Sequence, residues 1–506
     1  MDTQTLAQWA ILAYLVVLTI ICIYGAHRYF LLLLYYRVRR QAARPKARFA
    51  ELPRVTVQLP MYNEQYVAAR IIERACALDY PRDRLQIQVL DDSTDETQQI
   101  AQQTVARMRA AGHDVVYLHR TNRVGYKAGA LEEGTRQASG EFIAIFDADF
   151  LPPPSILRDT IDYFTDERVG MVQARWDHIN RGQSILTEAQ AIFLDGHFVV
   201  EHTARNRTGR FMSFNGTAGV WRKAAIADAG GWQHDTLTED LDLSYRAQLH
   251  RWKFVFLPHI TAPAELPPEM NAFKAQQHRW TKGGAQTCVK LLPRVLASDM
   301  PWWVKVESFF HLTSGAVYVL VVLLSLLLGP ALVAKLALKQ PQPAWVPWYE
   351  LLLFVIGFGS TTLFYIVSQH ELLRGWWRGL CYVPALMAVG IGIAFNNALA
   401  ALDGFFGSTG EFVRTPKFGD AAQRSPDWKR RLGAFRIRTN WKVWAELAMG
   451  LYLIACAATL LLFENWFERV SMALPFLVIF IVGYFYIALH TFYTGWLARR
   501  AHARSL

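Results

Sequence analysis

Long apolar segments lie at both ends of the chain and enclose a central region of ordinary polar composition. They are Trp9–Leu34, Phe309–Leu336, Trp348–Val367, Cys381–Leu402, Val443–Phe463 and Met472–Tyr493. Each is about as long as the ~20 residues that an α-helix needs to cross the hydrocarbon core of a bilayer. The chain is therefore predicted to be neither a simple soluble enzyme nor a protein buried wholly in the membrane.

Basic residues predict the orientation of these segments. A cluster follows the first segment with no acid among its members: Arg37, Arg39, Arg40, Arg44, Lys46 and Arg48. Because such clusters gather on the cytosolic side of membranes, we expect the N-terminus outside and residues 50–295 in the cytosol. The same rule explains the net charge of +11 better than nucleic-acid binding does, so no nucleic acid is expected as a partner.

One apolar segment is predicted not to cross. If all of them crossed, nine basic residues between positions 403 and 442 would lie outside. Cys381–Leu402 contains Pro384 and the pair Asn396–Asn397, so we expect it to be interfacial or re-entrant. The expected parts of this multi-pass cell-membrane protein (inner membrane, if bacterial) are an anchor at 1–36, a cytosolic domain at 50–295, two spans and an interfacial helix at 296–403, a cytosolic loop at 404–442, and two spans with a basic tail at 443–506.

Short apolar runs alternate with helical patterns between residues 50 and 260. The expected strands are Arg54–Leu59, Gln86–Leu90, Val115–Leu118, Phe142–Phe146 and Met171–Ala174, and two of the expected helices are Glu64–Cys76 and Glu96–Ala110. This alternation is typical of βαβ units, so it predicts an α/β domain with a mostly parallel sheet. Ligands of such sheets bind beyond the carboxyl ends of the strands.

Acidic side chains follow three of the expected strands. The stretches are Tyr62-Asn63-Glu64, Asp91-Asp92-Ser93-Thr94-Asp95 and Asp147-Ala148-Asp149. Carboxylates gathered at one edge repel one another, and a divalent ion that also binds diphosphate oxygens relieves this repulsion. For the second stretch, capping of the next helix is an equally good explanation. Neither a dinucleotide fingerprint nor a P-loop is present in the sequence.

Taken in order, these motifs resemble the D, D, D, Q(Q/R)xRW series of the processive family 2 glycosyltransferases. The stretches that carry the series are Asp92, Asp147-Ala148-Asp149, Thr238-Glu239-Asp240 and Gln276-Gln277-His278-Arg279-Trp280. Four more are similar to the cellulose-synthase-like A and C enzymes, the mannan and glucan synthases: Leu59–Glu64, Val89–Asp95, Gly125–Leu131 and Phe214–Arg222. The resemblance implies a GT-A-like domain, transmembrane helices, and an inverting enzyme that extends and extrudes a β-glycan.

The resemblance also implies a role for each matched residue. These roles are donor contacts at Tyr62, Glu64, Asp92 and Lys127, nucleotide and Mn²⁺ or Mg²⁺ binding at Asp147 and Asp149, the general base at Asp240, the leaving diphosphate at Gln276 and Arg279, and stacking on the acceptor sugar at Trp280. One base and a stabilised leaving group suffice for inversion in a single displacement, so no nucleophilic triad is expected.

A further match lies in the predicted cytosolic loop. Phe412–Lys417 resembles the FxVTxK gating loop of the family, with Arg414 where the family usually has Val. Phe412, Thr415 and Lys417 are the matched positions, and we expect them to close over the donor diphosphate. A basic loop resting on anionic headgroups is the alternative.

Three functional hypotheses follow from the sequence, and the first is a processive polysaccharide synthase. UDP-glucose is the expected donor, with GDP-mannose as the other donor of the resembled enzymes and a β-glycan as the acceptor. The alternative is a lipid glycosyltransferase with a glucosyl-diacylglycerol or glucosylceramide-type product. A membrane channel or scaffold is the non-enzymatic hypothesis, and the acids at three strand ends argue against it. The sequence does not indicate linkage, chain length or partner subunits.

Overall fold

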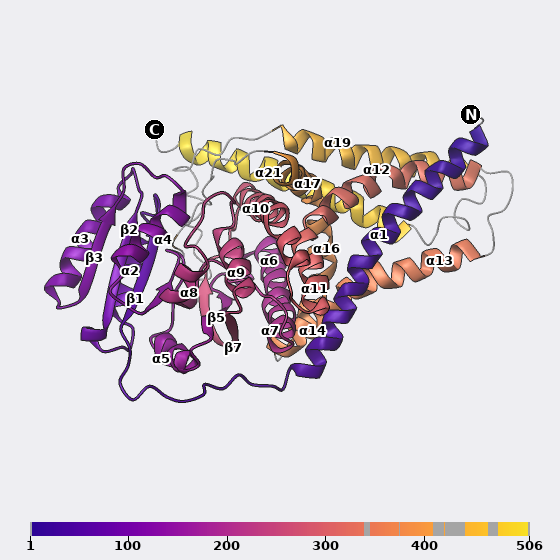
Figure 1. Cartoon of the computed structure of the whole chain (residues 1–506). Coiled ribbons are helices and arrows are strands. Elements are labelled where there is room, and N and C mark those ends of the chain that lie inside the picture. Colours follow the sequence, from indigo (N-terminus) through magenta and orange to yellow (C-terminus); the bar gives the residue numbers. More distant parts are fainter. Residues whose placement is uncertain are drawn as a thin grey trace.

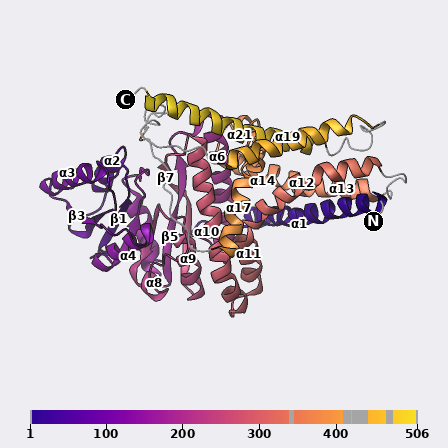
Figure 2. The ribbon, with the colours of Figure 1, turned by 90° about the horizontal axis from the view of Figure 1, so that it is seen from above.

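A sheet covered by helices and a bundle of long helices make up the molecule, and they meet along a shared boundary (Figure 1). The structure is a computed structural model that describes residues 3–337, 345–373, 375–407, 419, 441–463 and 474–503. Figure 2 shows α1 (Thr3–Val38), α12 (Ala316–Ala337) and α19 (Lys442–Leu460) extending together away from the sheet.

The sheet has seven strands in the described part of the chain, in the order β3-β2-β1-β4-β6-β5-β7. Their bounds are β1 Val55–Met61, β2 Leu85–Asp91, β3 Asp114–His119, β4 Phe142–Ile145, β5 Val169–His178, β6 Gly219–Arg222 and β7 Lys253–Ala264. Only β6 runs antiparallel to its neighbours, β4 and β5. The predicted α/β class with a mostly parallel sheet is confirmed. The five expected strands are present, and β6 and β7 are additional.

Helices cover both faces of this sheet. They are α2 Ala68–Cys76, α3 Thr97–Ala110, α4 Tyr126–Gln137, α5 Ile156–Ile161, α6 Ile185–Asp195, a π-helix at Gly196–His202, α7 Thr203–Arg207, α8 Lys223–Asp228, α9 Glu239–Leu249 and α10 Met270–Ala297, with 3₁₀ turns at Arg82–Arg84, Asp162–Thr165 and Arg181–Gln183. Every residue of β1 and β2 is buried, as expected for parallel strands with two covered faces.

Polar pairs inside the sheet fix how β1 and β2 align. Thr56 donates to Gln86 over 3.0 Å, and Gln58 donates to Gln88 over 3.0 Å, all within the buried interior. A shift of register by one residue would separate both pairs and leave buried polar groups unsatisfied. The pairing also aligns Met61 with Asp91, so the two strands end side by side. Tyr62 and Asp92 therefore emerge next to each other.

Several helices are long and apolar enough to cross a membrane, as expected. Within the described residues there are five: α1, α12, the run formed by α13 (Trp345–Phe354), a π-helical turn and α14 (Ser360–Leu372), α19, and α21 (Leu474–Ala503). The short α15 (Trp377–Leu380) precedes a pair, α16 (Val383–Gly392) and α17 (Ala394–Phe406), which is bent by 49°. This pair occupies the segment predicted to be interfacial or re-entrant, and whether it crosses stays a prediction.

One expected segment is divided in the structure. Phe309–Leu336 was expected to be continuous, but α11 (Trp302–Thr313) ends before α12 begins at Ala316. The break falls at Ser314 and Gly315, both poor helix formers. No start was predicted for α11, because its first residues lie outside the apolar run.

The last helix of the sheet domain, α10, joins it to the long helices. Lys274 forms a buried ion pair with Glu446 of α19, at 2.7 Å. Lys282, also buried, forms an ion pair with the exposed Asp403 of α17, at 2.5 Å. Breaking a buried pair leaves an uncompensated charge. The two halves therefore meet in a defined geometry along α10.

The contact between α16 and α21 yields a stability prediction. A Cβ at Gly392 would lie 2.2 Å from the carbonyl oxygen of Gly483, while one at Gly390 would meet nothing within 4 Å. We expect Gly392→Ala to lower the free energy of unfolding by about 1–3 kcal/mol, because the helices must separate. Thermal unfolding in detergent measures this, with Gly390→Ala as the matched control. Equal midpoints for the two variants would contradict the close contact.

Candidate active site

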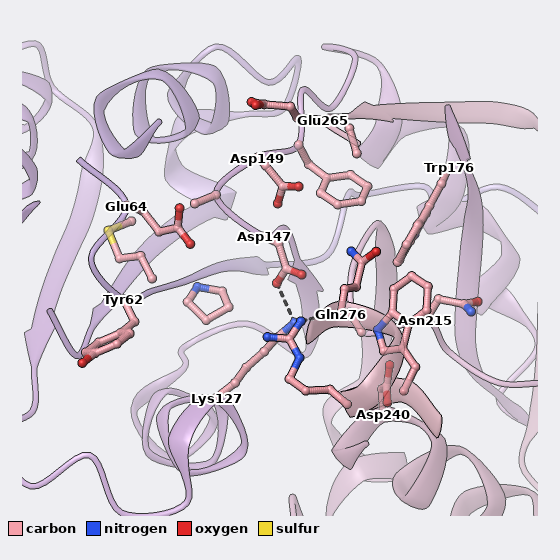
Figure 3. Close-up of a pocket in the computed structure, with 18 of the residues that line it drawn as sticks. Tyr62, Glu64, Lys127, Asp147, Asp149, Trp176, Asn215, Asp240, Glu265 and Gln276 are labelled. Atoms are coloured by element: carbon pink, nitrogen blue, oxygen red, sulfur yellow. Dashed lines mark hydrogen bonds and ion pairs between the residues drawn. The ribbon is translucent and has the colours of Figure 1, made fainter. Parts of the chain in front are cut away.

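A cavity of about 200 Å³ lies at the carboxyl edge of the sheet, beside α9 and α10. All of the site residues predicted within the sheet domain line it: Tyr62, Glu64, Asp92, Lys127, Asp147, Asp149, Asp240, Gln276, Arg279 and Trp280. In Figure 3, Tyr62 and Glu64 lie at one end, Asp147 is central, and Trp176, Asn215 and Asp240 lie at the other end. The predicted loop residues Phe412, Thr415 and Lys417 lie outside the described residues.

Lys127 lies among the carboxylates at the centre of the cavity. Its Nζ donates to Asp147 Oδ1 at 2.5 Å and to the carbonyl oxygen of Gly216 at 3.0 Å, and it lies 4.0 Å from Glu239. Burial opposes the charge, but the carboxylates of Asp147 and Glu239 outweigh it and raise the pKa of Lys127. The Lys127 ammonium thus offsets part of the repulsion among the carboxylates. From the sequence, a divalent metal ion was expected in this role.

Asp240 lies in the first turn of α9, directly after Glu239. Burial and the neighbouring charge of Glu239 raise the pKa of Asp240 to about 7. Burial likewise raises the pKa of Glu239. A carboxylate with a pKa near neutrality is suited to accept a proton in a reaction at neutral pH.

Three site residues project from α10 into the cavity. Gln276, Arg279 and Trp280 are spaced three and four residues apart, which places them on one face of a helix. Burial lowers the pKa of Arg279 to about 10, so its guanidinium stays charged at neutral pH. The ring of Trp280 packs against Trp176, with centroids 6.4 Å apart. This face offers a cation beside an aromatic surface.

The acids after β2 divide between structure and site. Asp91 accepts hydrogen bonds from Tyr117, at 2.6 Å, and from the amide of Ser93. Asp95 accepts one from the amide of Thr97, the first residue of α3, so Asp95 orders the turn that leads into this helix. Of the three, only Asp92 lines the cavity, where Arg120 holds both of its oxygens at 2.8 and 2.5 Å.

Sequence reasoning missed several residues at this site. They are Arg120, Arg123, Trp176, Asn215 and Glu265. The Arg123 guanidinium lies 3.4 Å from the ring centroid of Tyr62. Both arginines follow β3, the third predicted strand, whose end also reaches this edge. Examining the end of that strand as well would have found them.

The loop of Asn215, Gly216 and Thr217 connects the groups at the centre of the site. The Thr217 hydroxyl accepts from the amide of Asp147 at 2.9 Å, and the Gly216 carbonyl holds Lys127. Gly216 has φ +81°, and a Cβ there would lie 3.0 Å from Asp240 Oδ2. A side chain at this position would therefore displace the Asp240 carboxylate.

Asp147 and Asp149 were predicted to bind a metal ion. Among the described residues, no group of three or more His, Cys, Asp or Glu side chains could hold one. Two carboxylates that line the same cavity nevertheless suit an ion whose other ligands are water and substrate phosphate oxygens. The residues fit a divalent cation that binds together with a diphosphate.

Comparisons with known proteins agree with this geometry. The profile of "Glycosyltransferase like family 2" matches residues 53–283. Glucomannan 4-beta-mannosyltransferase 7 of Arabidopsis thaliana is 32% identical over 468 residues, covering 89% of this chain and 79% of that protein. Glucomannan 4-beta-mannosyltransferase 9 of the same plant is 34% identical over 417 residues, covering 79% and 74%.

A solved structure shares the fold. It is a mannosyltransferase from Pyrobaculum calidifontis in complex with GDP-Man and Mn²⁺, with a TM-score of 0.51 and 21% identity. The match covers 77% of this chain and 99% of that chain. The likeness confirms the predicted GT-A-like fold.

The raised pKa of Asp240 predicts a pH-dependent stability. Because its pKa in the folded chain, about 7, exceeds the ~3.9 of an unfolded Asp, stability is lost as pH rises between these values. We expect Asp240→Asn to raise the thermal midpoint more at pH 8 than at pH 5. Thermal unfolding at both values measures this, with the exposed Asp83→Asn as a control. The same gain at both values would contradict a raised pKa.

Proposed function

The chain belongs to glycosyltransferase family 2, and from this premise we propose that it transfers mannose from GDP-mannose to a growing β-glycan, which it extrudes across a membrane. The observation that carries the proposal is the cavity in which the acid series and the Gln276–Trp280 motif meet. The relatives are named glucomannan mannosyltransferases, which favours mannose over the glucose expected from the sequence. Their names give no support to a lipid glycosyltransferase.

The two ends of the cavity suit the two substrates. We assign the nucleoside to the end formed by Tyr62, Glu64 and Asp92, where the Tyr62–Arg123 stack offers a planar surface. The diphosphate then lies near the cations of Lys127 and Arg279. A divalent cation on Asp147 and Asp149, when bound, supplies further positive charge to the leaving diphosphate. Mn²⁺ accompanies GDP-Man in the Pyrobaculum enzyme.

The other end of the cavity suits the acceptor sugar. Trp176 and Trp280 provide an apolar surface on which a sugar ring can pack. Asp240 lies at this end and takes the proton of the acceptor hydroxyl (Figure 3). As the acceptor oxygen bonds to the anomeric carbon, the bond from that carbon to the diphosphate breaks on the opposite face, which inverts the configuration.

We place the sheet domain in the cytosol, because the basic cluster Arg37–Arg48 follows α1. This orientation gives the cavity access to cytosolic nucleotide sugars. The division into anchor, catalytic domain, spans and gating-like loop is part of the same proposal.

The role of Asp240 predicts a selective loss of catalysis. We expect Asp240→Asn to lower kcat at least ~100-fold, because the amide cannot take the proton. GDP-mannose affinity should stay within about twofold, because Asp240 lies away from the nucleoside end. Calorimetric titration and a radiolabel transfer assay measure the two quantities, with Asp235→Asn as a control outside the cavity. A variant that keeps more than about a tenth of its turnover would remove Asp240 from this role.

The pair Asp147 and Asp149 predicts dependence on a divalent cation. We expect turnover to stop in excess chelator and to return with Mn²⁺ or Mg²⁺. Asp149→Ala should raise the cation concentration needed for half-maximal turnover at least ~10-fold, because one of the two carboxylate ligands is lost. Metal titration of the wild type and the variant measures this. Full activity in chelator refutes the assignment.

One experiment tests the proposed function as a whole. The purified full chain, in lipid nanodiscs, is given labelled GDP-mannose or UDP-glucose, and the product is sized and its linkages are analysed. A β-linked polymer from GDP-mannose supports the proposal. Incorporation from UDP-glucose alone overturns the choice of mannose. A lipid bearing a single sugar overturns the polymer.

A further inference from the structure

The helix α11 has two faces of opposite character. Its exposed face is apolar and mostly aromatic, with exposed fractions of 70% for Trp302, 40% for Trp303, 44% for Val306 and 42% for Phe309. The opposite face is buried and consists of Val304, Glu307, Ser308 and Leu312. A row of exposed aromatic side chains indicates a surface that contacts either lipid or another protein.

The position of α11 indicates which partner covers the apolar face. It directly precedes α12, a candidate span, and Phe310 stacks on His27 of α1, another candidate span, with centroids 4.2 Å apart. In Figures 1 and 2, α11 lies at the boundary between the sheet half and the long helices. Tryptophan is enriched where the hydrocarbon core meets the headgroups. The exposed face therefore continues the lipid-facing surface of the spans.

The buried face of α11 carries a charge that belongs to a network. Glu307 accepts a hydrogen bond from Arg205 Nε at 2.9 Å, and His27 Nε2 lies 3.0 Å from its other oxygen. Its side chain is 2% exposed. A buried carboxylate in such a pair holds its neighbours in place, because separating the charges leaves one of them unpaired.

This network continues to the active-site loop. Arg205 Nη1 lies 3.3 Å from Glu201 Oε2, and that oxygen lies 2.9 Å from His197 Nδ1. The Asn215 amide nitrogen lies 3.0 Å from His197 Nε2. Because an amide nitrogen only donates, His197 accepts at Nε2 and carries its proton on Nδ1, which donates to Glu201.

The end of the network is Asn215, which lines the cavity and is held on its other side. Its Oδ1 accepts from His202 Nε2 at 2.7 Å. The next residues of the loop, Gly216 and Thr217, hold Lys127 and the amide of Asp147. A displacement of Asn215 would therefore shift groups on both sides of the proposed reaction.

A second contact leads from α11 to the general base. His311 Nδ1 lies 2.8 Å from the hydroxyl of Tyr245, which is fully buried in α9. The first turn of α9 contains Asp240. The helix α11 therefore contacts α9 directly, and it is linked to the Asn215 loop through Arg205, Glu201 and His197.

We propose that α11 lies in the membrane interface with its Trp302–Phe309 face in lipid, and that this seating positions the active site through Glu307. Glu307 is a positioning residue, not a catalytic one. The effect on turnover rests on the proposed function, whereas the lipid contact and the ordering of the loop do not. The interface acts on the network because a helix held in the plane of the bilayer keeps Glu307 and His311 at fixed depth.

The first test locates the apolar face. An environment-sensitive fluorophore is placed on Val306→Cys, with Cys381 and Cys456, the two cysteines that are not buried, changed to Ser. In nanodiscs of phosphatidylcholine and phosphatidylglycerol, doxyl-labelled lipid should quench this fluorophore and leave one on the exposed Asp83→Cys unquenched. An unquenched fluorophore at position 306 overturns the lipid contact, and means that protein, either a second copy or a partner, covers this face.

The second test measures positioning without requiring activity. We expect the double variant Trp302→Ser with Trp303→Ser to increase hydrogen exchange at residues 213–217 in nanodiscs. The reason is that α11 loses apolar contacts with lipid and is held less firmly at the interface. Glu307→Gln should do the same, and the combined variant should exchange no faster than Glu307→Gln. Trp348→Ser, which removes a Trp that is 73% exposed on α13, is the matched control. Unchanged exchange in the variants overturns the positioning role.

Turnover provides a third measurement, in which the α11 variants, Glu307→Gln and their combination are compared again. Each α11 variant should lower kcat about fivefold while KM for the donor stays within about twofold, and the combination should lose no more than Glu307→Gln alone. Losses that multiply would show that the two sites act independently, which overturns the coupling. If the wild type turns over no sugar nucleotide, the proposed function fails, and the quenching and exchange measurements still decide this proposal.

Discussion

Repulsion among carboxylates gathered at one sheet edge is the constraint on which the site depends. The acids come from three places in the fold: Asp92 after β2, Asp147 and Asp149 after β4, and Glu239 with Asp240 at the start of α9. Cations from separate elements offset them: Arg120, Lys127 and Arg279. The balance is incomplete at α9, where the pKa of Asp240 rises to about 7 because of burial and Glu239. Under the proposed function, burial and this residual repulsion suit Asp240 to act as a base at neutral pH, and the remaining carboxylates suit a divalent cation bound with a diphosphate.

The sequence was sufficient to predict the edge at which these groups meet. Parallel strands align their carboxyl ends, so the acids after β1, β2 and β4 had to emerge together once the βαβ alternation was recognised. The ordered motif series supplied α9 and α10, which follow the sheet and are not placed by strand order. The predicted fold class is confirmed, and the cavity collects every predicted site residue of the sheet domain. Their individual roles remain predictions.

The remaining features depend on contacts between residues far apart in sequence. Lys127 was predicted as a donor contact, and its ion pair with Asp147 appears only when α4 packs on β1 and β2, since β1 is the neighbour of β4. The strand β6 has four residues and no periodic pattern long enough to recognise, yet it alone reverses the sheet direction. The network from Glu307 to Asn215 joins α11 to the loop before β6. Its inner pairs, His197–Glu201 and Glu201–Arg205, are i,i+4 contacts, but Glu307 and Asn215 join it from other parts of the chain. Hydrophobic periodicity carries no information about such polar partners.

The helix α10 lines the proposed active site and also contacts the candidate membrane spans. One turn of α10 presents Arg279 and Trp280 to the cavity, and the same helix is ion-paired through Lys274 to Glu446 in a candidate span. The acceptor end of the cavity is therefore formed in part by a helix, α10, that also contacts candidate spans. Under the proposed function, an acceptor sugar packed on Trp280 has the membrane helices as its neighbours. Under the same proposal, a polymer that grows there lies next to the bundle of long helices, because α10 contacts both α17 and α21.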